Sequence, residues 1–146
     1  MVEIKIDERP ILGLLKKLAA KGGDMTAPFR EIAGVMADAV EENFDQQGRP
    51  PWTPLAAATI AARQKSGHWP GSILQVHGRL ASSITSESDA FRAVVGSNVV
   101  YARIHHLGGM AGRGRKVKIP ARPYLQLADE DEEEIMDILR RYLSGD

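Results

Sequence analysis

Residues 24–44, DMTAPFREIAGVMADAVEENF, form the longest helical pattern in the chain. Asp24 or Thr26 can cap the start of a helix here, and Pro28 suits its first turn. The apolar side chains that recur at offsets of three and four are Phe29, Ile32, Ala33, Met36, Val40 and Phe44. The pattern predicts a helix with one buried face, and packing alone explains such a stripe.

Two shorter helices are predicted on either side of this one. An amphipathic helix follows Pro10, carries Ile11 and several leucines on one face, and ends at Gly22-Gly23. Another helix begins at Thr53-Pro54 and continues to about Lys65. Alanines at five positions give the segment Leu55 to Ala62 a smooth surface on which a second element can pack closely.

Short strands are predicted in the second half of the chain. Residues 84–88 and 91–95 alternate in polarity about a Ser88-Asp89 turn, with Phe91, Ala93 and Val95 on one face, which predicts a hairpin. Residues 99–107 suit a short helix or an irregular segment. Four glycines between 108 and 114 predict a mobile loop, and residues 117–119 a returning strand that Pro120 ends.

A closing helix is expected from about Asp129 to Leu143. Its acids lie at the N-terminal end, where the helix dipole favours negative charge. Its inward side chains are Ile135, Ile138, Leu139 and Tyr142. Together these elements predict an α+β fold: helices from the N-terminal half and a C-terminal helix packed on a small, mostly antiparallel β-sheet, with a long glycine-rich basic loop.

Composition excludes several classes of protein. A chain of 146 residues suits one domain with its own core, and it contains no cysteine, so disulfides and thiolate metal sites are excluded. The N-terminus lacks the features of a signal peptide, and no apolar run approaches the roughly 20 residues of a membrane span. Nineteen basic and nineteen acidic side chains cancel, which argues against a surface built wholly for nucleic acid.

The charges are nevertheless unevenly placed along the chain. One block is acidic and includes Asp129, Glu130, Asp131 and Glu132 in the unbroken run to Glu134. The other is basic and consists of Arg113, Arg115, Lys116, Lys118 and Arg122. Such blocks are most often solvated surface. The alternative is that the two blocks face each other across a subunit boundary, where complementary charge sets orientation and register.

Trp52 lies in a loop that Gly48 and three prolines keep irregular. Two interpretations remain open for its indole. It can close one side of the core, which we favour because a rigid proline-rich loop is one way to do so. It can instead anchor a neighbouring subunit, since tryptophan is enriched at interface hot spots.

No catalytic or cofactor site is predicted. His105 and His106 are adjacent, so their side chains point apart and cannot grip one metal ion as a pair at positions i and i+4 would. The serines lie in no nucleophile elbow, and a run of solvated carboxylates lacks the burial that tunes a general acid. The glycine-rich stretch lacks the Gly-Lys-Ser/Thr ending of a phosphate-binding loop. We therefore expect no enzyme activity, no metal and no cofactor.

Several short motifs follow one another in a fixed order through the middle of the chain. They are Gln46, Gly48, Pro51-Trp52 and Pro54; Gly78-Arg79-Leu80; Val95-Gly96-Ser97-Asn98; Tyr101-Ala102-Arg103-Ile104-His105; and Ile119-Pro120-Ala121-Arg122-Pro123-Tyr124. In this order they resemble the phage virion morphogenesis family, the tail-completion proteins of contractile-tailed phages of the P2 and Mu kind and of prophages. The resemblance implies one such domain over residues 1–146. It implies mainly structural roles for Gly78, Leu80, Tyr101, His105 and Pro123.

The resemblance also implies a function. Family members complete the tail so that it can be joined to a filled head, which requires no covalent chemistry. Related neck and terminator proteins act as closed rings, commonly sixfold, so the expected partners are further copies of the chain in a hexameric ring and tail tube, terminator or neck proteins. The protein is then a virion component assembled in the bacterial host cytoplasm, with no membrane partner.

Two other functions stay open from the residues alone. A nucleic-acid-binding accessory protein would use the basic residues from Arg113 to Lys118, although no aromatic side chain is interleaved there as a stacking platform. A small hydrolase or metal enzyme would be centred on His105. A nucleic-acid partner is therefore less expected than a protein partner. Catalysis is the least expected of the three functions.

Overall fold

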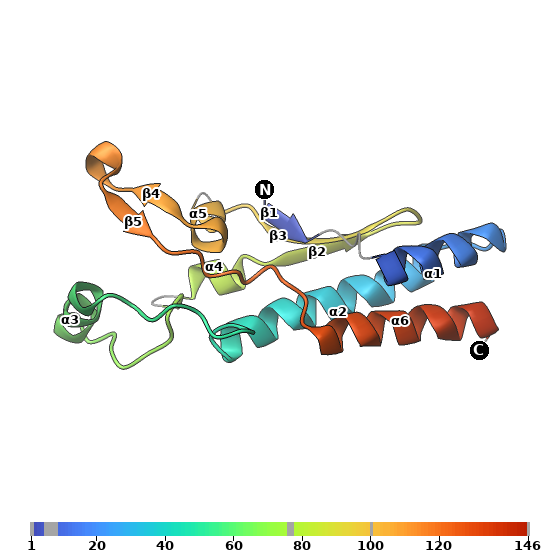
Figure 1. The fold of residues 1–146 in the computed structure, drawn as a ribbon, viewed down its shortest axis with the longest axis horizontal. Coiled ribbons are helices and arrows are strands. Elements are labelled where there is room, and N and C mark those ends of the chain that lie inside the picture. The colour runs from blue at the N-terminus through green and yellow to red at the C-terminus, as the bar shows by residue number, and fades with distance from the viewer. Residues whose placement is uncertain (1, 5–8, 76–77, 100, 146) are drawn as a thin grey trace.

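The computed structural model describes residues 2–4, 9–75, 78–99 and 101–145. The molecule is elongated, with a helical half at one end and a small hairpin and a separate helix at the other (Figure 1). The helices are α1 (Arg9–Ala20), α2 (Thr26–Asp45), α3 (Ala57–Lys65), α4 (Arg79–Ser82), α5 (Ala102–Leu107) and α6 (Asp129–Ser144). The strands are β1 (Val2–Ile4), β2 (Thr85–Ser88), β3 (Ala93–Ser97), β4 (Gly109–Ala111) and β5 (Val117–Ile119). The predicted α+β class is confirmed.

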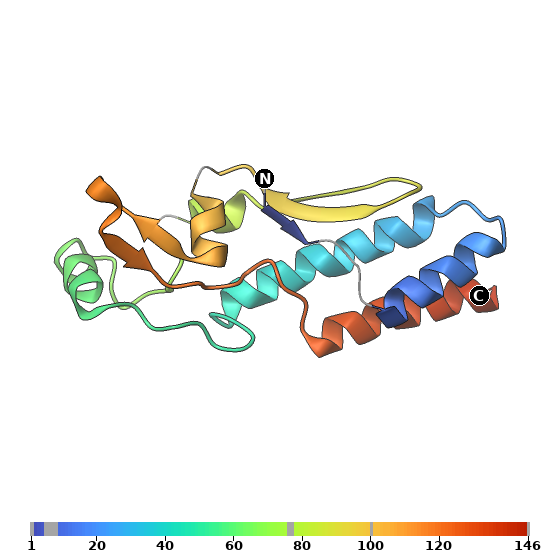
Figure 2. The same ribbon diagram turned by 45° about the horizontal axis from the view of Figure 1, so that its top comes forward.

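The core forms around α2, the longest helix. One side of α2 packs against α6, which also contacts α1, and the other side packs against β2 and β3 (Figure 2). The predicted stripe is therefore buried, and Ile32, Met36 and Val40 are completely enclosed. The helix begins at Thr26 as expected, but the predicted cap is wrong, because the N-cap position is Met25 and carries no side-chain cap. The carboxylate of Asp24 accepts the backbone N–H of Thr26 at 2.9 Å from one position further out.

The larger sheet has three antiparallel strands in the order β1-β3-β2. The predicted hairpin is confirmed as β2 and β3, with Ser86 opposite Val95. The prediction for Phe91 is wrong, because its side chain is 87% exposed at the tip of the hairpin instead of facing the core. The Asp89 carboxylate accepts the backbone N–H groups of Phe91 and Arg92 at 2.7 and 3.0 Å, and this tight turn holds Phe91 outside the strand.

Helix α3 begins later than predicted. Thr53 and Pro54 stay extended because the guanidinium of Arg122 binds their carbonyl oxygens, with Nε donating to Thr53 at 2.8 Å and Nη2 to Pro54 at 3.0 Å. The first helical residue is therefore Ala57. No residue of α3 is buried, so its alanine surface faces solvent.

The glycine-rich stretch is not the mobile loop that its composition predicts. Gly109–Ala111 forms β4, which pairs with β5 so that Met110 lies opposite Lys118. Gly108 at φ +74° and ψ 175° precedes this strand, in a conformation that is essentially restricted to glycine. The expected strand ending at Pro120 is confirmed as β5, and the whole forms a basic β-hairpin joined by a 3-10 turn at Arg113–Arg115.

The chain returns from this hairpin to the core through Tyr124, whose side chain is fully enclosed. Its hydroxyl donates to the carbonyl of Ala102 at 2.6 Å, and burial raises the pKa of Tyr124 to about 12. Asn43 on α2 donates to the carbonyls of Tyr124 and Gln126, both at 2.8 Å. These bonds connect α5 and the start of α6 to the end of α2.

Gly108 provides a first test of this arrangement. A Cβ atom there would lie 2.7 Å from the backbone nitrogen of Ala121 and 2.9 Å from the carbonyl oxygen of Ile119, neither of which can move alone. We expect Gly108→Ala to lower the free energy of unfolding by about 1–3 kcal/mol in urea titrations. Gly34→Ala, at an open position inside α2, should instead raise it by about 0.5–1 kcal/mol. Equal effects of the two substitutions would contradict the strained position of Gly108.

Candidate functional site

One end of the molecule is free of acidic residues. Residues 46–84 and 98–128 contain no Asp or Glu, and they supply α3, α4, α5 and the β4–β5 hairpin, which lie together at that end (Figure 1). The basic residues in these two stretches are Arg49, Arg63, Lys65, Arg79, Arg103, Arg113, Arg115, Lys116, Lys118 and Arg122. The neutral chain is therefore strongly polarised along its length, which the two local charge blocks only partly indicate.

The β4–β5 hairpin presents most of the predicted basic block to solvent. Arg113, Arg115, Lys116 and Lys118 are all exposed, and none of them forms an ion pair with a described residue. Nearby, the side chains of Leu107, Met110 and Val117 are 49–55% exposed. The hairpin thus combines unpaired positive charge with exposed apolar surface, as a protein-binding arm would.

Arg122 does not join this exposed basic surface. It is 6% exposed and its guanidinium holds the carbonyls of Thr53 and Pro54, so the solvated position expected for the basic block does not apply to it. Burial, with the neighbouring charge of Arg63, lowers the pKa of Arg122. Its role in the described residues is to position the loop that carries Trp52.

The acidic block lies near the middle of the molecule. Asp129, Glu130, Glu133 and Glu134 are exposed at the start of α6, whereas Glu132 is partly buried. The end of α2 lies beside the start of α6 and adds the exposed carboxylates of Asp38, Glu41 and Asp45 (Figures 1 and 2). Acids at a helix C-terminus oppose the helix dipole. The dipole of α2 therefore does not favour the acids in its last turn.

Two acids of the predicted block have a partner within the chain. Arg49 donates to Glu130 and to Asp131, each at 2.8 Å, and also to Asn43 Oδ1 at 2.7 Å and to the carbonyl of Ala39 at 2.9 Å. The interface role predicted for these acids therefore competes with an internal one. Sequence analysis missed Arg49, because the residues it joins are about 80 positions apart and no local pattern links them.

Trp52 lies inside the core of the chain. The indole is 6% exposed, meets the ring of Phe44 edge-on at 5.8 Å, and donates from Nε1 to the carbonyl of Pro123 at 2.8 Å. The favoured interpretation, that it closes one side of the core, is confirmed. Pro123 takes part through its carbonyl oxygen.

The remaining motif residues gather around a small pocket. Gly78 adopts φ +71° and Leu80 is 3% exposed, while the rings of Tyr101 and His105 meet edge-on at 5.6 Å. His106 points elsewhere, toward the ring of Tyr124. No group of His, Asp and Glu side chains in the described ranges is arranged to hold a metal ion, and His77 lies outside those ranges.

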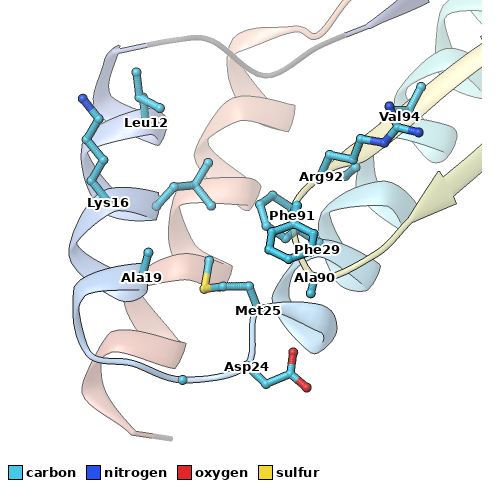
Figure 3. Close-up of a pocket in the computed structure, with 13 residues that line it drawn as sticks. Leu12, Lys16, Ala19, Asp24, Met25, Phe29, Ala90, Phe91, Arg92 and Val94 are labelled. Atoms are coloured by element: carbon cyan, nitrogen blue, oxygen red, sulfur yellow. The ribbon is translucent and has the colours of Figure 1, made fainter.

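An apolar groove of about 700 Å³ lies at the opposite end of the molecule, between α1 and the tip of the β2–β3 hairpin. Leu12, Met25, Phe29 and Phe91 border it from four different segments (Figure 3). Sequence analysis missed this surface, because it placed Phe91 on one strand face together with Ala93 and Val95, whereas the strand begins at Ala93. The tight turn at Asp89 was the available signal.

Comparison with known proteins agrees with the motif pattern. A family model described as the phage virion morphogenesis family matches residues 6–144. The chain is 42% identical to the Mu-like prophage FluMu G protein 2 of Haemophilus influenzae, over 97% of this chain and 96% of the relative. It is 35% identical to the putative capsid assembly protein G of Escherichia phage Mu, over 99% and 95% of the two chains. No solved structure matches.

Within the described ranges, no helix has the length and hydropathy needed to cross a bilayer. The family model matches residues 6–144, and both relatives align along nearly their full length. The similarity therefore extends well beyond the motifs of the middle third. This chain belongs to the phage virion morphogenesis family.

Proposed function

We propose that this protein is a non-enzymatic structural component that completes a phage or prophage tail and joins it to the head, working as a closed homo-oligomeric ring. Membership of the family supports a role in virion assembly, and the Mu relative is described as a capsid assembly protein. The neighbours proposed for the ring are tail tube, terminator or neck proteins. Assembly would take place in the host cytoplasm.

The observation that carries the ring is the separation of opposite charges on one elongated chain. The basic hairpin lies at one end and the acids of α2 and α6 near the middle, so one copy cannot bring these surfaces together (Figure 1). A closed ring requires two different patches on each subunit, each meeting the other patch on the next copy. The solvent-facing alanines of α3 add a smooth surface on which a neighbouring copy could pack closely.

Light scattering coupled to size exclusion tests this proposal. We expect a species several times the 15.9 kDa of the monomer at low salt, and a shift toward the monomer in 1 M salt. Salt acts here because the screening length falls from about 30 Å at 0.01 M to about 3 Å at 1 M. The double substitution Lys116→Gln and Lys118→Gln should weaken assembly at low salt.

The matched control removes the same charge from α1, at the other half of the molecule, by Lys16→Gln and Lys17→Gln. Assembly of this control should equal that of the unaltered protein. A monomer at every salt and protein concentration would count against self-assembly. Equal weakening by both pairs of substitutions would show that net charge matters and the hairpin does not.

The second candidate function, binding of nucleic acid by residues 113–118, is favoured by the acid-free end described above. It predicts that the protein binds duplex DNA. The logarithm of the association constant should fall steeply with the logarithm of salt concentration, because each neutralised phosphate releases counterions. Fluorescence anisotropy with a labelled duplex between 50 and 200 mM salt measures this slope. If the slope is steep and is lost in the Lys116→Gln and Lys118→Gln protein, the hairpin is a nucleic-acid-binding surface and not an interface of the ring.

A further inference from the structure

A pocket of about 350 Å³ lies between the end of α3, α4 and α5. Its polar lining comes from Arg63, Arg79, Tyr101 and His105, and none of the described residues that line it is acidic. Its apolar wall is formed by Ile73, Leu74 and Leu80. Two guanidinium groups and an imidazole therefore face one pocket within the acid-free end of the molecule.

Both arginines are held in place by groups of the pocket wall. Arg63 donates from its two terminal nitrogens to the carbonyls of Ser72 and Ile73, at 2.7 and 2.6 Å. The guanidinium of Arg79 lies over the ring of Tyr101, 5.8 Å from its centre, and forms no ion pair with a described residue. Carbonyl oxygens and an aromatic face orient these cations, and no described carboxylate pairs with either of them.

His105 adds a buried polar atom to the pocket. Its Nδ1 atom is buried and has no hydrogen-bond partner among the described residues. Burial, and then the positive charge of Arg122, lower the pKa of His105. Arg63 in turn lowers the pKa of Arg122, after the larger effect of burial. The case for an anion rests on the lining itself, which brings Arg63, Arg79 and His105 to one pocket with no described acidic residue among them.

We infer that this pocket binds a carboxylate from a second copy of the chain, held by the Arg79 guanidinium beside Tyr101 and His105. The planar fork of an arginine matches a carboxylate, and the apolar wall suits the methylene groups of a glutamate side chain. Exposed acids at the end of α2 and the start of α6 can supply it. The source of the carboxylate rests on the proposed ring, whereas the affinity of the pocket for a carboxylate does not.

The test uses an isolated peptide as the probe, so that it does not depend on assembly. The acetylated and amidated peptide DEDEEE copies residues 129–134 and is added to the protein at fixed ionic strength. Proton–carbon spectra of the histidine rings should show a saturable shift at His105 and a higher titration midpoint for its imidazole, because a nearby anion stabilises the protonated ring. Arg79→Gln should weaken binding of the peptide about ten-fold or more.

The matched control is Arg103→Gln, which removes an exposed charge from α5 outside the pocket lining. It should change peptide affinity by less than about two-fold, since exposed charges at a distance are screened. Equal losses of peptide affinity in the two variants would contradict binding in the pocket. They would show that the peptide responds only to the overall positive charge of this end. Tighter binding of inorganic phosphate than of peptide at the same ionic strength would overturn the carboxylate assignment.

The two proposals can fail separately. If the peptide shifts His105 but light scattering finds a monomer under all conditions, the carboxylate pocket stands and the ring does not. If the ring forms, the peptide leaves His105 unchanged and Arg79→Gln assembles normally, the ring stands and the pocket assignment is wrong.

Discussion

Replacing Trp52 with alanine is expected to lower the free energy of unfolding by about 3–5 kcal/mol, the range found for large aromatic side chains removed from a core. The indole is 6% exposed, packs edge-on against Phe44, and donates to the carbonyl of Pro123. Removing it leaves a cavity beside α2 and a carbonyl without its donor. Urea unfolding followed by circular dichroism measures the loss.

Phe91→Ala is the matched control for this substitution. Phe91 is also a large aromatic residue, but its side chain is 87% exposed. The same truncation should therefore change the free energy of unfolding by no more than about 0.5 kcal/mol. If Trp52→Ala were as mild as Phe91→Ala, the indole would not be a core residue, and the interface interpretation of Trp52 would return.

Replacing Arg49 with methionine should have an effect of similar size, a loss of about 3–5 kcal/mol. The side chains of Arg49 and Asp131 are only 10% and 12% exposed, and their ion pair is 2.8 Å long. Methionine keeps most of the apolar stem but leaves the Asp131 carboxylate without its cation in a site with little water. The bonds to Asn43 and Ala39, which connect the loop to α2, are lost as well.

The control for Arg49 is Arg140→Met on α6. Arg140 forms ion pairs of 2.9 Å with Glu133 and Asp137, but all three side chains are more than half exposed. Exposed pairs contribute about 0–1 kcal/mol, so this variant should unfold close to the unaltered protein. A small loss for Arg49→Met, equal to that of Arg140→Met, would show that solvent reaches the Arg49–Asp131 pair.

Local patterns predicted most of the secondary structure. The apolar residues at offsets of three and four placed α2 and α6 within a few residues of their observed bounds, because one helix face must be buried. The β2–β3 hairpin followed from alternation about Ser88-Asp89. Two of the errors lie where another part of the chain acts on the backbone. Arg122 delays the start of α3, and pairing with β5 orders the glycine-rich stretch.

The candidate surfaces were less accessible to prediction. The hairpin cations were identified correctly as exposed residues, since four charges within six positions have no local means of burial. Arg122 belonged to the same run in the sequence but not to the same surface. Nothing in the sequence indicated the contacts of Arg49 or Arg79, because the partners of Arg49 are distant in the chain and Arg79 lies over an aromatic face.

The sequence by itself determined the main helices, the β2–β3 hairpin, the family and the segregation of charge along the chain, because periodicity, motif order and charge are properties of neighbouring residues. Only the tertiary structure decided which charged side chains are exposed and which are buried or paired. Folding buries Arg122 against backbone carbonyls, pairs Arg49 with Asp131, and leaves Arg79 beside His105 without a carboxylate. Burial and pairing depend on contacts between residues far apart in the chain, and these contacts exist only once α2, α6 and the hairpin have packed.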